Sequence, residues 1–205
     1  NPDKPLGYIL NEGTIRASDF VALIAPGVEN RGVVIANLGT ASIVSGEEVT
    51  LDFIGDGLIN FAINKAVEGT VLDNKGNSIS DQINNSGLIQ ANGGQVILSA
   101  LSTSDVIKNV VNNEGMIEAN TVLKKDGKIL LLGGNQGVVR VSGTLDASGD
   151  DIGEIGGTAH VLGQKVALDE GSLVDVSGDV GGGEALIGGD YQGGNSMIQN
   201  AWRTY

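Results

Sequence analysis

The residues that could carry out chemistry are few, and most of them are acidic. The chain has one histidine, His160, and no cysteine, so thiolate catalysis and Cys/His zinc sites are excluded. As a catalytic base, His160 would need a nucleophile and an orienting carboxylate, but the chain has no Gly-x-Ser-x-Gly motif. We expect His160, which lies in a strand-like run, to be a surface residue without a catalytic role.

Acidic residues are the main candidates for metal binding. Six of them stand in two clusters or beside paired glycines: Asp52, Asp56, Asp150, Asp151, Glu154 and Asp190. Carboxylates in turns are typical Ca²⁺ ligands, but the tandem Gly-rich nonapeptide repeat of calcium-binding β-rolls is absent. We therefore expect solvated turn residues, with no metal and no other cofactor.

A carboxylate pair formed by Asp146 and Asp175 could cleave a polysaccharide if both residues line one face of the fold. Outward polar positions on alternating strands explain the same two residues without any chemistry, and aromatic residues that could hold sugars make up only 3% of the chain. Asn84-Asn85-Ser86 matches the N-glycosylation pattern, but a structural role for Asn85 also explains it. We predict no catalytic residue.

Composition narrows the classes of partner. The chain has 205 residues and a net charge of −13, whereas nucleic-acid binding needs a face rich in Lys and Arg. No apolar run approaches the roughly 20 residues of a membrane span, so we expect no membrane insertion. The acidic charge also disfavours anionic glycans such as heparin, and a neutral glycan or a protein receptor fits it better. We expect a monomer.

A short phrase recurs along the chain: glycine, any residue, an aliphatic residue, any residue, a small residue. Its glycines are Gly13, Gly32, Gly57, Gly87, Gly115 and Gly143, and Gly171 opens a seventh copy that is out of step by one residue. The intervals are 19, 25, 30, 28, 28 and 28 residues. The copy at Gly57 is looser, because Phe61 stands where the small residue is expected.

Each copy has the pattern of a half-buried strand. Residues 139–147 alternate between aliphatic or small residues and polar ones, and residues 48–52 and 165–169 do the same. Period-two alternation over short runs indicates strands, and Gly/Asn/Asp-rich turns separate them. Short strands that return at a fixed step favour coils stacked on one another over a meander or a sandwich.

We therefore predict an all-β fold, a right-handed parallel β-helix of about eight coils, formed by residues 1–205 as a single domain. Equivalent residues should form ladders along the stack. Glycines would serve corners that need φ > 0, alanines would sit where the coil is narrow, and asparagines would pair their amides with the next coil. The predicted ladder residues are Asn11, Asn30, Asn85, Asn113, Gly13, Gly32, Gly87, Gly115, Gly143, Ala17, Ala36, Ala91, Ala119 and Ala147.

Six phrases of the sequence, which cover nearly the whole chain, resemble the exoproteins of bacterial two-partner secretion, the filamentous haemagglutinin family. They are Asn11–Ala36, Ser45–Ile59, Ser86–Ala100, Val110–Ala119, Gly137–Gly149 and Gly181–Gly193. The two Asn-Pro-Asn-type motifs of the family's secretion signature are absent, and only Asn1-Pro2-Asp3 is close to one. The resemblance therefore implies a segment near the end of the secretion domain and the start of the stalk.

The resemblance also implies a location and a partner. Such exoproteins cross both membranes of a Gram-negative bacterium, leave through an outer-membrane β-barrel transporter, and are secreted or stay at the cell surface. We expect a fragment of a longer exoprotein that acts as a non-catalytic adhesin, with an unknown host receptor or glycan. The alternatives are a passive stalk or secretion-folding segment of such an exoprotein (haemolysin-like, haem-acquisition or contact-dependent toxin) and, less favoured, a polysaccharide-active enzyme.

Overall fold

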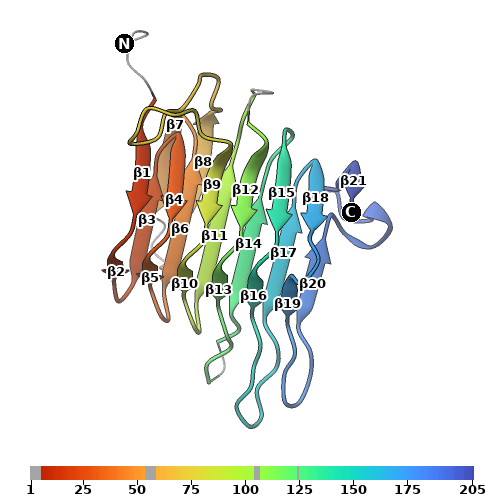
Figure 1. Cartoon of the computed structure of the whole chain (residues 1–205). Coiled ribbons are helices and arrows are strands. Elements are labelled where there is room, and N and C mark those ends of the chain that lie inside the picture. The colour runs from red at the N-terminus through yellow and green to blue at the C-terminus, as the bar shows by residue number, and fades with distance from the viewer. Residues whose placement is uncertain (1–5, 54–58, 104–106, 124) are drawn as a thin grey trace.

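The chain winds into a stack of three-stranded coils (Figure 1). The structure, a computed structural model, describes residues 6–53, 59–103, 107–123 and 125–205. Successive coils hydrogen-bond in parallel and in register, so that three long parallel sheets run along the stack. This is a right-handed parallel β-helix, and the predicted fold class is confirmed.

Each coil contributes one strand to each sheet. Sheet 1 contains β1 (Tyr8–Asn11), β4 (Gly27–Asn30), β9 (Asp81–Asn85), β12 (Asn109–Asn113), β15 (Val138–Val141), β18 (Lys165–Leu168) and β21 (Arg203–Thr204). Sheet 2 contains β2 (Thr14–Arg16), β5 (Val33–Ile35), β10 (Leu88–Gln90), β13 (Met116–Glu118), β16 (Thr144–Asp146) and β19 (Leu173–Asp175). Sheet 3 contains β3 (Phe20–Ile24), β6 (Thr40–Ser45), β11 (Gln95–Ala100), β14 (Lys128–Leu132), β17 (Thr158–Leu162) and β20 (Glu184–Ile187).

The number of coils is smaller than predicted. In the described part of the chain, six complete coils are followed by β21, which begins a further turn. The difference arises between β6 and β9, where the chain leaves the stack and forms an antiparallel hairpin of β7 (Glu48–Phe53) and β8 (Ile59–Lys65). Gly57 lies outside the described residues, and the residues from Ile59 onward in its copy of the phrase belong to β8 and not to a coil.

The core is a column of aliphatic side chains inside the coils. In β15, Val139 and Val141 are fully buried while Arg140 between them points outward. Register pairing places Ile83, Val111 and Val139 in one buried row that ascends the stack. Because strand side chains alternate with period two, a slip of one residue would turn this row outward, and the apolar pattern therefore specifies the register.

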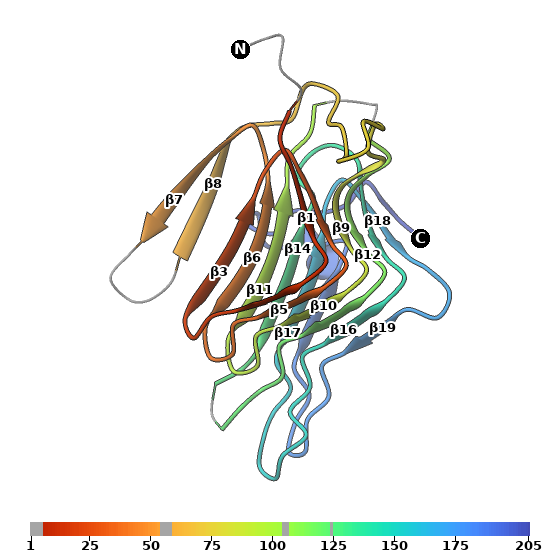
Figure 2. The same cartoon turned by 60° about the vertical axis from the view of Figure 1, so that its left-hand side comes forward.

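Two additions lie outside the column. The β7–β8 hairpin stands away from the coils (Figure 2), and the ring of its Phe61 stacks on Phe20 of β3 with centroids 6.3 Å apart. At the other end, the chain after β20 passes through a short 3₁₀ turn (Tyr191–Gly193) and returns so that β21 pairs with β18. None of the helical structure in the described ranges is long enough to cross a membrane.

Candidate functional site

Four asparagines form a hydrogen-bonded ladder inside the first four coils. The Nδ2 of Asn11 donates to Oδ1 of Asn30 at 2.7 Å, Asn30 donates to Asn85 at 2.8 Å, and Asn85 donates to Asn113 at 2.7 Å. Asn30, Asn85 and Asn113 are fully buried. Each internal member both donates and accepts, so the amides are satisfied without water. The ladder ends at Asn113, whose Nδ2 contacts backbone carbonyl oxygens, and buried Val141 takes the next position.

The ladder glycines also stack, but for a different reason from the one predicted. A Cβ on Gly115 would lie 2.2 Å from the carbonyl oxygen of Gly87, and Gly32, Gly87 and Gly143 would make the same clash with the coil before them. None of these glycines has a positive φ. The prediction that they serve left-handed corners is wrong, because the close approach of neighbouring backbones, and not φ, excludes a side chain.

The ladder alanines follow the same corner. Ala36, Ala91, Ala119 and Ala147 are fully buried, and Ala17 packs against the core at the end of the stack. Each backbone N–H donates to a carbonyl of the next coil, as from Ala91 to Glu118 at 2.8 Å. The narrow corner has room for a methyl group.

Sequence reasoning missed two further ladders. Asn37, Asn92 and Asn120 follow the alanines, and the Oδ1 of one accepts the backbone N–H of the next at 3.1 and 3.0 Å. A second row of glycines stands directly before strands of sheet 3. A Cβ on any of them would clash with a carbonyl oxygen of an earlier coil; they are Gly39, Gly94, Gly157 and Gly183. The signal in the sequence is a glycine directly before β6, β11, β14, β17 and β20.

His160 lies on β17 and pairs with Glu184, with 2.6 Å between Nε2 and Oε1. The histidine side chain is 15% exposed, and the glutamate is 61% exposed. No serine or other nucleophile forms a hydrogen bond with His160 in the described part of the chain, and its contact with Glu184 joins neighbouring coils.

The candidate calcium residues are engaged in turns. Glu154 is 5% exposed, and its carboxylate accepts the backbone N–H of Leu123 at 2.7 Å and that of Asp151 at 3.3 Å. Asp150 and Asp151 are exposed. Among the described residues, no three acidic or histidine side chains converge on a common point that could hold a metal ion.

The remaining candidate acids lie elsewhere. Asp190 accepts the backbone N–H of Asn195 at 2.9 Å. Asp56 lies outside the described residues, and only the backbone position of Asp52, in β7, is described.

Asp146 and Asp175 are register partners on the outer face of sheet 2, and Glu118 precedes them in the same row. Hydrogen bonds from Ser177 lower the pKa of Asp175 and keep it ionised. Burial, followed by the charge of Asp146, raises the pKa of Glu118. The two pKa values are thus shifted in opposite directions by their surroundings. However, Asp146 is occupied by Asn120 and by the backbone of Ser148, so the row has structural partners.

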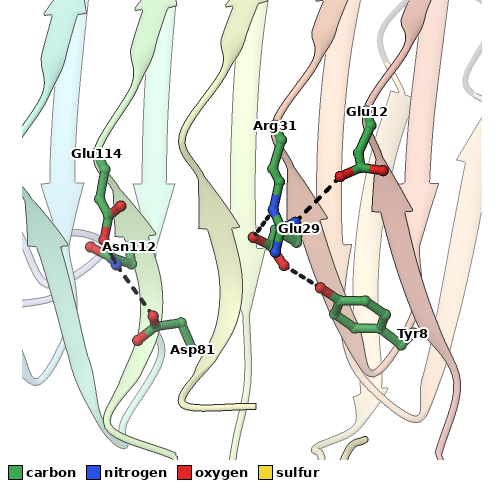
Figure 3. Close-up of polar contacts among 7 residues, drawn as sticks. All are labelled: Tyr8, Glu12, Glu29, Arg31, Asp81, Asn112 and Glu114. Atoms are coloured by element: carbon green, nitrogen blue, oxygen red, sulfur yellow. Dashed lines mark hydrogen bonds and ion pairs between the residues drawn. The ribbon is translucent and has the colours of Figure 1, made fainter. Parts of the chain in front are cut away.

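The outer face of sheet 1 carries two polar clusters, which Figure 3 shows. In the first, Tyr8 donates to Glu29, and Arg31 pairs with Glu29 at 2.5 Å and with Glu12 at 3.3 Å. Burial and the hydrogen bond to Glu29 raise the pKa of Tyr8. The cluster joins the first two coils at the surface.

The second cluster lies further along the same face. Asn112 donates to Asp81 at 3.3 Å and to Glu114 at 2.9 Å. Asn84, the acceptor position of the glycosylation pattern, lies within β9, one residue before its end, and in the same row as Asn112. The side-chain oxygen of Asn84 is buried. A glycosylated asparagine, in contrast, presents its amide from an exposed loop.

An open hollow lies at the corner between sheets 2 and 3, beside the loop that joins β13 to β14. Two adjoining cavities of about 480 and 810 Å³ share Asp19, Leu38 and Lys125. We call this hollow the corner groove; it extends from Arg16 in the first coil past Leu38 to Lys128 in the fourth coil.

The comparisons with known proteins identify the fold family. No protein-family model and no curated protein matches the sequence. The solved structure of the HMW1 secretion domain from Haemophilus influenzae is similar to 100% of this chain, with 30% sequence identity and a TM-score of 0.74. The predicted resemblance to two-partner secretion exoproteins is confirmed. The chain spans about half of that structure, 49% of its length.

Proposed function

We propose that this chain is a secretion-domain segment of an exported two-partner secretion exoprotein, and that its role is to fold into a β-helix as the protein leaves the cell. The observation that carries this proposal is the similarity of the whole chain to about half of the HMW1 secretion domain. Its partner would be an outer-membrane β-barrel transporter, and its location the cell surface or the medium.

The stack suits such a role because its contacts are repetitive and sequential. Each coil bonds to its neighbours through in-register strands and ladder side chains. In repeat proteins of this kind, each unit stabilises mainly the next one. A chain that emerges gradually can therefore fold one coil at a time, and the folded coils cannot slide back.

Export of the full protein that contains this chain, coexpressed with its cognate transporter, tests the proposal. Gly115→Ala and Asn85→Ala should disrupt stacking and leave the protein in the cell, whereas Asn64→Ala, at an exposed hairpin position, should be exported normally. The fraction in the medium is measured with and without the transporter. Equal export of all variants, or export without the transporter, would contradict the proposal.

Attachment to host cells or surfaces is the second candidate function, and the corner groove is the observation that favours it. A groove on the outside of a rigid stack can be displayed away from the cell. Saturable binding of the 205-residue chain to host cells, compared with a charge-matched β-helix, would support attachment. Absence of binding at high concentration would leave the segment as a scaffold for export.

A further inference from the structure

The corner groove has an unusual charge for this protein. The chain carries a net charge of −13, yet three cations and only two acids line the groove: Arg16, Lys125, Lys128, Asp19 and Asp126. All five are exposed. Among the described residues, none of these three cations takes part in an ion pair, whereas Arg31, Lys65 and Arg140 each pair with a carboxylate on other surfaces.

Leu38 lines both cavities of the groove, and its backbone is strained. Its φ is 62°, in the left-handed region, and it is 56% exposed. Gly93 holds the same place in the next coil with φ 67°. The Cδ2 of Leu38 lies over Gly93, 2.6 Å from where a Cβ would stand. A leucine there costs conformational energy that glycine would avoid, which suggests that its exposed aliphatic surface has a use.

In the second to fourth coils, the backbone that lines the groove is already paired with neighbouring coils. Leu38 donates to the carbonyl of Asn92, Gly93 donates to Asn120, and Gln95 donates to Gly39. The N–H of Lys125 donates to the carbonyl of Val122 at 3.0 Å, and the N–H of Val122 donates to the carbonyl of Lys125 at 3.1 Å, so the backbone of that lysine is held in place. A peptide that docks by strand addition needs unpaired backbone groups. Across the second to fourth coils, recognition at the groove therefore comes from side chains.

We propose that the corner groove binds an oligosaccharide that carries carboxylate groups. Arg16 offers a planar fork that matches a carboxylate, and the two lysines offer point charges. Leu38 supplies an apolar surface for the face of a sugar ring. Because the rest of the chain is acidic, the groove should favour widely spaced carboxylates over dense sulfation. This proposal deepens the attachment candidate and is independent of the export role.

The test is titration of the 205-residue chain with tetragalacturonic acid at low salt, followed by calorimetry or by NMR shifts. We expect a Kd on the order of 1 mM, no measurable binding of the methyl-esterified tetramer, and weaker binding at higher salt. Arg16→Gln with Lys125→Gln should weaken binding about two- to fivefold for each cation removed. The matched control, Lys75→Gln with Lys165→Gln, removes the same charge elsewhere and should leave binding within about twofold.

Leu38→Gly separates binding from folding. It should weaken binding while leaving the midpoint of unfolding equal or higher, because glycine relieves the left-handed strain. Equal binding of the methyl ester, equal binding of a tetraglutamate peptide, or equal loss in the two double variants would overturn the proposal. So would the absence of binding at 10-fold above the expected Kd, about 10 mM. These outcomes leave export, and attachment through other surfaces, unaffected.

Discussion

Replacement of Asn85 by alanine tests whether the asparagine ladder holds the coils together. Asn85 is fully buried, accepts from Asn30 and donates to Asn113. Its removal leaves Asn30 Nδ2 and Asn113 Oδ1 without their partners. An unsatisfied buried polar group costs about 1–3 kcal/mol. Asn30 Nδ2 also lies 3.4 Å from the carbonyl oxygen of Leu88, which reduces its loss, so we expect about 2–5 kcal/mol in total.

The position within the ladder supplies an internal comparison. Asn11 stands at the end, is 8% exposed, and contacts one ladder partner, Asn30. Asn11→Ala leaves the buried Oδ1 of Asn30 without its donor and frees the exposed N–H of Gly13, which water can satisfy. It should therefore cost about 1–3 kcal/mol, the cost of one orphaned buried group. Asn64→Ala removes an exposed amide that bonds Thr50 on the hairpin and should cost less than about 0.5 kcal/mol.

The measurement is urea unfolding of the 205-residue chain, followed by far-UV circular dichroism, with the three variants and the parent compared at one temperature. The predicted order of destabilisation is Asn85→Ala, then Asn11→Ala, then Asn64→Ala. If Asn85→Ala cost no more than Asn64→Ala, the buried amides would contribute nothing net, and the reasoning would be refuted. If Asn11→Ala cost as much as Asn85→Ala, the number of ladder partners left unpaired would not determine the loss of stability.

Three further results are expected. Gly115→Ala should destabilise the chain by about 3 kcal/mol or more, because its Cβ would meet the Gly87 carbonyl at 2.2 Å. Gly76→Ala, where φ is 83° and the space is open, should cost about 1 kcal/mol; equal unfolding midpoints would refute this difference. Because the pKa of Glu118 is raised in the fold, its contribution to stability is present below the unfolded pKa and is lost as pH rises through the folded pKa. Glu118→Gln should remove that dependence and stabilise the chain at pH 7, as a pH series of unfolding curves would show. Arg140→Gln breaks a half-exposed pair with Asp169 and should cost under about 1 kcal/mol, less at high salt; a larger, salt-independent loss would contradict this.

The sequence predicts the stack well where identical side chains of neighbouring coils contact one another. The Asn30, Asn85 and Asn113 positions could be aligned because an identical residue returns at each coil, even though the intervals are 55 and 28 residues. The count of coils failed because alternation at residues 48–52 is typical of any half-exposed strand. Such a pattern cannot distinguish a hairpin strand from a coil strand, since both have one face turned to solvent.

The site features that escaped prediction depend on what lies beside a residue in the next coil. Nothing in the local sequence distinguishes Gly115, excluded from carrying a side chain by a carbonyl, from Gly93, which has a left-handed φ. The corner groove likewise combines Arg16 of the first coil with Lys125, far away in the chain. Variable loops between β13 and β14, β16 and β17, and β19 and β20 obscure the spacing that would have revealed these neighbours.

The end of the asparagine ladder divides the stack into two kinds of coil. In the first four coils the same inward corner holds an amide, and from the fifth coil it holds Val141 and then Leu168. A buried amide tolerates only a partner in register, whereas valine and leucine can pack in several ways. The coils that specify register most strictly are thus the earliest in the chain. Within these six coils, the earlier four would set the register, and the later two would then need only apolar contacts to continue it.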